Sequence, residues 1–70
     1  MEMDRALVHK ARRLITGANV HRANTLIFQY QQAVAMFGEG GNPKMDPARF
    51  EQRLREWVRI ETRRTVSSIL

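Results

Sequence analysis

Ten residues near the middle of the chain, GEGGNPKMDP at positions 38–47, contain three of its four glycines and both of its prolines. These residue types most often end helices and form turns. On either side of the stretch, apolar residues recur every three or four positions, which is the helical period. The sequence therefore predicts an all-α protein in which a turn at 38–45 joins two helices, at about 19–37 and 46–68.

The second of these helices has a well-marked start. Asp46 suits the capping position, and Pro47 suits the first helical position, where its missing N–H is harmless. Gly38 is placed to end the preceding helix. Two helices of similar length joined by a short turn predict an antiparallel helical hairpin.

A further helical segment is predicted at about residues 4–16, where Asp4 is a suitable cap and Leu7, Ala11 and Leu14 share one face. Gly17 follows, and glycine within a helix costs about 1 kcal/mol relative to alanine. Two alternatives remain open at this point. Either a short N-terminal helix ends near Gly17 and Asn19 caps the next helix, or one long first helix continues with a kink.

The middle helix is apolar on more than one side, because Ile27, Phe28, Val34 and Met36 extend its main apolar face. One hairpin neighbour cannot cover so wide a surface. Either the N-terminal segment folds back as a third helix or a second chain docks, and we expect oligomerisation, as a homodimer or in a hetero-complex. The predicted partner-binding residues are Leu26, Tyr30 and Phe37 on the first arm and Phe50, Leu54 and Trp57 on the second.

The chain is basic, with twelve Lys and Arg against seven Asp and Glu and a formal net charge of +5. A balance of this kind favours an acidic partner, either a protein or a nucleic acid. The residues predicted to contact it are Arg49, Arg53, Arg59 and Arg63 on the last helix. Glu61 interrupts the apolar face of that helix. Because an unpaired buried carboxylate is costly, we expect Glu61 to lie at the mouth of the bundle or to meet a cation from a partner helix.

The residue pattern argues against catalysis. There is no cysteine, and His9 and His21 are twelve positions apart, which is not a ligand spacing on a helix. Glu51 and Glu56 are predicted to pair with Arg55 and Arg59 on a solvated surface. We expect no enzyme activity, metal, cofactor or small-molecule substrate. Without a signal sequence or an apolar run of about 18 residues, we expect a cytoplasmic protein that does not enter membranes.

The segment NPKMDPARFEQRLREW, followed by RRTVSSIL, resembles the small helical-hairpin proteins of bacterial type III secretion, namely needle co-chaperones and needle or inner-rod subunits. The resemblance implies that the apolar faces of both arms bind other secretion subunits. A phage-encoded protein that binds a host factor would fit the same physical pattern. The positions that carry the resemblance are Gly40, Gly41, Asp46, Pro47, Phe50 and Gln52.

The sequence thus predicts a small non-enzymatic assembly protein that acts through apolar helix faces, as an adaptor, chaperone or inhibitor of a larger partner. The alternative is a basic helical nucleic-acid-binding protein or a small transcriptional regulator.

Overall fold

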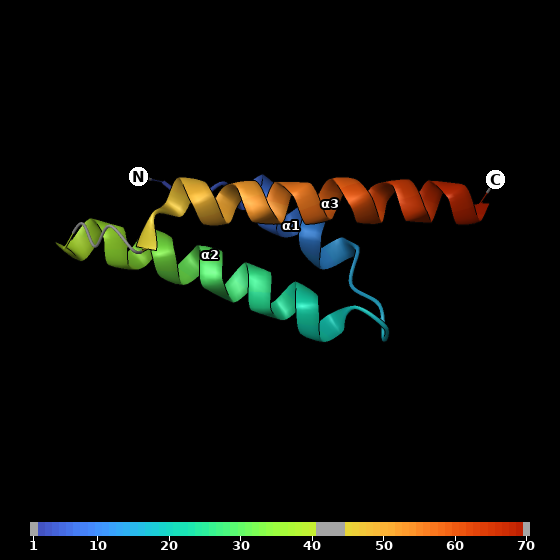
Figure 1. The fold of residues 1–70 in the computed structure, drawn as a ribbon, viewed down its shortest axis with the longest axis horizontal. Helices are drawn as coiled ribbons and strands as arrows, with labels where there is room; N and C mark the ends of the chain where they lie inside the picture. Colours follow the sequence, from blue (N-terminus) through green and yellow to red (C-terminus); the bar gives the residue numbers. More distant parts are fainter. Residues whose placement is uncertain (1, 41–44, 70) are drawn as a thin grey trace.

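The computed structural model of the chain describes residues 2–40 and 45–69. These residues form three helices, α1 (Arg5–Arg13), α2 (Val20–Gly40) and α3 (Pro47–Ile69), and they contain no strand, which confirms the all-α prediction. Figure 1 shows α2 and α3 side by side and running in opposite directions, with α1 behind them. The molecule is elongated, with extents of 46 × 18 × 17 Å.

Helix α1 begins at its predicted cap and ends three residues earlier than the sequence suggests. The Oδ1 atom of Asp4 accepts the Leu7 N–H at 3.0 Å. At the other end, the Leu14 N–H donates to the Ala11 carbonyl and the Ile15 N–H to that of Arg12, a tightened i−3 pattern that closes the helix. Helices α1 and α2 are therefore separate, and the continuous first helix is excluded.

The connection between α1 and α2 is organised by two polar side chains. Thr16 Oγ1 accepts the N–H groups of Ala18 and Asn19 at 3.2 and 3.3 Å. Asn19 stands before α2 and its carbonyl accepts the Ala23 N–H, but its side chain does not cap α2 as expected. Its Oδ1 instead accepts the Thr16 N–H at 2.7 Å, a local contact within the connection that competes with helix capping.

Helix α2 continues through Gly40, so Gly38 does not end it. A glycine in a helix costs only about 1 kcal/mol, which a long helix tolerates. Residues 41–44 of the predicted turn lie outside the described residues. Helix α3 starts at the predicted position, with Pro47 as its first residue and Asp46 Oδ1 accepting the Ala48 N–H at 3.1 Å.

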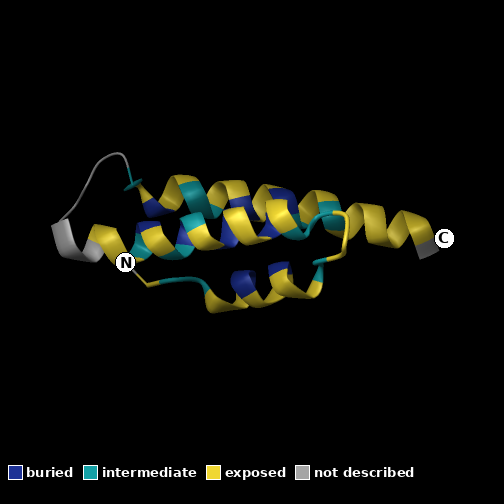
Figure 2. Ribbon diagram, turned by 90° about the horizontal axis from the view of Figure 1, so that it is seen from below, coloured by how far each residue is buried: buried dark blue, intermediate teal, exposed yellow. Residues whose placement is uncertain are grey.

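All three helices contribute to one apolar core, which Figure 2 shows along their facing sides. Helix α1 folds back onto the other two, so the chain's own first helix covers part of the wide apolar surface of α2. Full burial of a large apolar side chain contributes about 1.5–3 kcal/mol. The core side chains are those of Leu7, Val8, Ala11, Ala23, Leu26, Ile27, Tyr30, Leu54 and Trp57.

Some apolar surface remains uncovered within the described chain. Phe28, Met36 and Phe37 are exposed on α2, and Ile60 and Val66 are exposed on α3. The last turns of α3, residues 62–68, are exposed throughout, as the C-terminal end of Figure 2 shows. The fold therefore buries a central core and leaves apolar side chains exposed both in the middle of the two long helices, at Phe28 and Ile60, and nearer their C-terminal ends.

Candidate partner-binding groove

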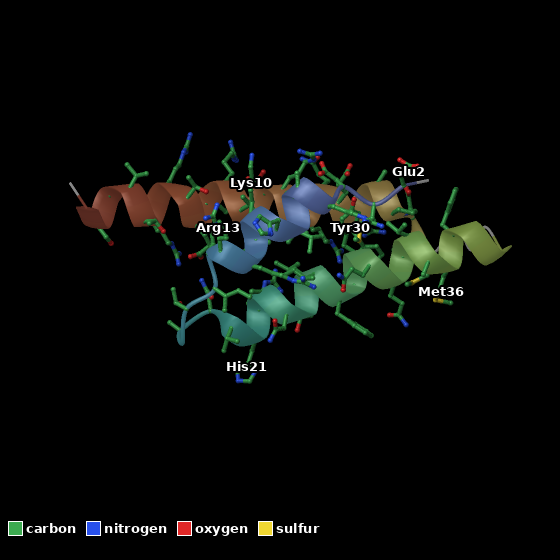
Figure 3. The ribbon with its side chains drawn as sticks, turned by 180° about the vertical axis from the view of Figure 1, so that it is seen from behind. Glu2, Lys10, Arg13, His21, Tyr30 and Met36 are labelled. Atoms are coloured by element: carbon green, nitrogen blue, oxygen red, sulfur yellow. The ribbon has the colours of Figure 1, made fainter. Side chains whose placement is uncertain are left out.

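The α2–α3 pair has two faces, and α1 covers only one of them (Figures 1 and 3). An open groove of about 750 Å³ runs between α2 and α3, and no α1 residue lines it. We call it the α2–α3 groove. Its lining residues are Arg22, Leu26 and Gln29 from α2, and Gln52, Arg53, Glu56, Trp57 and Ile60 from α3.

The floor of the groove is apolar. Leu26 and Trp57 belong to the core, and Trp57 keeps 9% of its surface accessible. Ile60 lies one turn further along α3 and is 43% exposed. A partner that settles here can bury apolar surface that the chain itself leaves in water.

The rim of the groove is positively charged. Arg22 and Arg53 make no ion pair with any side chain that the structure describes. The Arg53 guanidinium lies 5.4 Å from the centre of the Phe50 ring, close enough for a cation–π contact. Glu56, the acid among the lining residues, is paired with Arg59, as predicted. The groove therefore offers free cations but no free carboxylate among its lining residues.

The face under α1 carries a closed ring of polar contacts instead. The Asp4 N–H donates to the Tyr30 hydroxyl at 2.7 Å, and that hydroxyl donates to Glu51 Oε1 at 3.1 Å. Arg55 completes the ring, 3.7 Å from Glu51 Oε1 and 2.7 Å from Asp4 Oδ2. The predicted pairing of Glu51 with Arg55 is confirmed. Burial raises the pKa of Tyr30, and its contact with Glu51 acts in the same direction.

A second polar contact closes the opposite end of the covered face. Asn19 Nδ2 donates to the Leu14 carbonyl at 3.0 Å and to Glu61 Oε2 at 3.3 Å. Glu61 also lies 3.5 Å from Arg64 on its own helix. Glu61 is therefore satisfied within the chain, by an amide of the α1–α2 connection and a neighbouring arginine, and a cation from a partner helix is not needed to pair it.

Four of the six predicted partner-binding residues, Leu26, Tyr30, Leu54 and Trp57, lie in the core. Phe50 is half-buried against that core, and Phe37 is exposed near the end of α2. Contact with a partner stays a prediction for those with accessible surface, which are Phe37, Phe50 and the groove-facing edge of Trp57.

The four predicted acidic-partner or nucleic-acid contacts are all exposed on α3. Only Arg53 lines the α2–α3 groove, and Arg59 is held by Glu56. Arg49 and Arg63 are not among the groove residues. Sequence reasoning did not connect Arg22 with Arg53, because the two belong to different helices and 31 positions separate them.

A cluster of metal ligands and a helix able to span a membrane are both absent from the described part of the chain. There, no three side chains of the His, Asp or Glu type gather as metal ligands. In the same residues, no helix combines the length and the apolar character needed to cross a bilayer.

Comparison of the chain with protein-family models, with curated proteins and with solved structures gave no match.

Proposed function

We propose that this protein is a non-enzymatic binding protein that holds an acidic, amphipathic helix of a larger partner in the α2–α3 groove. The observation that carries the proposal is the combination of an apolar floor, at Trp57 and Ile60, with unpaired arginines on both sides, Arg22 and Arg53. Trp57 also belongs to the core, but Ile60 and the two arginines are exposed and take no part in it.

A helix is the occupant that the groove fits best. On the opposite face, α1 packs against α2 and α3 and buries the side chains of Leu7, Val8 and Ala11 there. Grooves between two packed helices commonly bind an amphipathic third helix. A partner helix in the open groove would complete a four-helix arrangement around the α2–α3 pair.

The charge of the rim argues for an acidic partner. Arginine binds carboxylates through two parallel hydrogen bonds, so Arg22 and Arg53 suit Glu or Asp on the flanks of a docked helix. Complementary charge also speeds association and excludes basic competitors.

A second copy of the chain fits this groove less well than a different protein. Each copy carries a formal net charge of +5, so two copies would bring like charges together at an already basic rim. We therefore propose a hetero-complex, in which the chain is an adaptor, chaperone or inhibitor. The resemblance to the small hairpin proteins of type III secretion implies a role of this kind.

The test uses the single tryptophan as its reporter, because Trp57 lies in the groove. The probe is a synthetic helical peptide with leucine at positions i, i+3, i+4 and i+7 and glutamate on both flanks. We expect the acidic peptide to shift Trp57 fluorescence saturably. A peptide of the same pattern with lysine in place of glutamate should have no effect.

A matched pair of variants locates the site. Ile60→Asp places a charge in the groove, whereas Val66→Asp makes the same change at a comparably exposed position of α3, 43% against 49%. We expect Ile60→Asp to weaken peptide binding at least tenfold and Val66→Asp to leave it within twofold. Equal loss in both variants would contradict the proposal, as would a dimeric mass by light scattering combined with Trp57 fluorescence that an added quencher does not reach.

A further inference from the structure

Helix α1 has a basic outer face that the groove does not involve. Leu7, Val8 and Ala11 are buried, and the other side chains of the helix are exposed to water. Five of these are basic or imidazole groups within nine residues, a length of about 14 Å. We call them the α1 basic face: Arg5, His9, Lys10, Arg12 and Arg13.

No carboxylate in the described part of the chain pairs with this face. The sequence has no Asp or Glu from residue 5 to residue 38, which covers all of α1 and most of α2. Asp4, at the start of α1, is already engaged by the Leu7 N–H and by Arg55. Figure 3 shows Lys10 and Arg13 on α1, on the side of the molecule opposite to that seen in Figure 1.

We infer that the α1 basic face binds the phosphate backbone of a nucleic acid. Duplex DNA carries one negative charge per about 1.7 Å of its axis, so a helix of this length spans several phosphates. Arginine and lysine neutralise phosphates and release counterions, which drives binding without reading the base sequence. Because the α1 basic face and the α2–α3 groove lie on different faces, one chain could hold a nucleic acid and a protein partner together.

A membrane surface fits the same face less well. Helices that lie in a bilayer interface insert a free apolar side, whereas the apolar side of α1 is buried in the core. The large apolar side chains that remain exposed in the described residues belong to α2 and α3. The α1 basic face thus has positive charge but no exposed large apolar side chain that could insert into a bilayer.

The test measures fluorescence anisotropy of a labelled 20-base-pair DNA duplex and of a 20-nucleotide single-stranded RNA, each of arbitrary sequence, at several salt concentrations. With four permanently charged groups on the α1 basic face, we expect log K to fall with log salt with a slope of about −3 to −4 on the duplex. Comparing the two probes shows whether paired or single-stranded backbone is preferred.

Two charge-matched variants assign the surface. Arg12→Ala with Arg13→Ala removes two charges from α1, and Arg49→Ala with Arg63→Ala removes two exposed charges from α3. We expect the α1 pair to reduce affinity at least tenfold and to flatten the salt slope by about 2, and the α3 pair to change affinity less than threefold. Circular dichroism of both variants checks that the helices remain.

Three results would overturn the inference. They are an equal or greater loss in the α3 pair, a salt slope near zero, and binding to anionic phospholipid vesicles at salt concentrations where neither nucleic acid binds.

Discussion

The two faces of the α2–α3 pair differ in what the chain supplies to them. The face under α1 is closed by apolar packing and by polar contacts at both ends. At one end these are the hydrogen bonds of the Tyr30 hydroxyl, and at the other the Asn19–Glu61 hydrogen bond. The opposite face has Trp57 and Ile60 on its floor and unpaired arginines on its rim. The difference suggests that one face stabilises the fold and the other is available to a partner.

The sharpest test of this comparison uses two aliphatic side chains six positions apart on α3. Leu54 is fully buried, so Leu54→Ala should cost about 2–5 kcal/mol in free energy of unfolding, a large part of the stability of so small a domain. Ile60 is open to the groove, so Ile60→Ala should cost less than about 1 kcal/mol. Urea denaturation followed by circular dichroism measures both. Similar costs would mean that the two faces are not distinct.

A smaller effect is expected from the polar ring on the covered face. Tyr30→Phe keeps the aromatic packing but removes the hydroxyl that accepts from Asp4 and donates to Glu51. Leaving these groups without their partner should cost about 1–3 kcal/mol. The exchange rate of the Asp4 amide proton should rise in the variant, and an unchanged rate would show that the ring does not hold α1.

The pH dependence of unfolding provides a second measure of the same hydroxyl. The pKa of Tyr30 is raised above its ordinary value of 10.0, chiefly by burial, so the folded state favours the neutral phenol. This contribution to stability is complete below pH 10 and decreases as the pH rises through the folded-state pKa. Between pH 9 and 11, wild-type protein should therefore lose more stability than Tyr30→Phe. Parallel curves would contradict the burial of this group.

The smallest effect is expected in the connection between α1 and α2, at Gly17. A Cβ added at Gly17 would meet no atom within 4 Å, and the residue does not adopt the left-handed backbone conformation that favours glycine. Gly17→Ala should therefore stabilise the protein by about 0.4–1 kcal/mol, by restricting the unfolded chain. A thermal melt compares it with Ala18→Gly, for which we expect the opposite sign. A loss of stability in Gly17→Ala would show that the connection needs glycine.

Several features that depend on neighbouring residues were predictable from the sequence, although the ends of α1 and α2 were not. Asp4 and Asp46 cap helices where expected, and Glu51 and Glu56 pair with arginines on their own helix. Each of these contacts joins residues two to four positions apart. Helical periodicity and capping preferences predict such contacts because both rules concern residues only a few positions apart.

Contacts between distant residues were not predictable in the same way. Tyr30 meets Asp4 and Glu51 across 26 and 21 positions, and Asn19 meets Glu61 across 42. An apolar stripe also cannot show whether its own chain or another will cover it. For this reason Leu26, Leu54 and Trp57 were expected at an interface, although most of their surface is buried against α1 and between α2 and α3.

The long, narrow outline of the molecule has a practical consequence for its hydrodynamics. Its greatest extent, 46 Å, is more than twice either of the other two, 18 and 17 Å. A rod experiences more friction than a sphere of equal mass, so a single chain should elute early from a gel-filtration column. Calibration against globular standards would then overestimate its molecular mass, so that a monomer could be mistaken for a dimer.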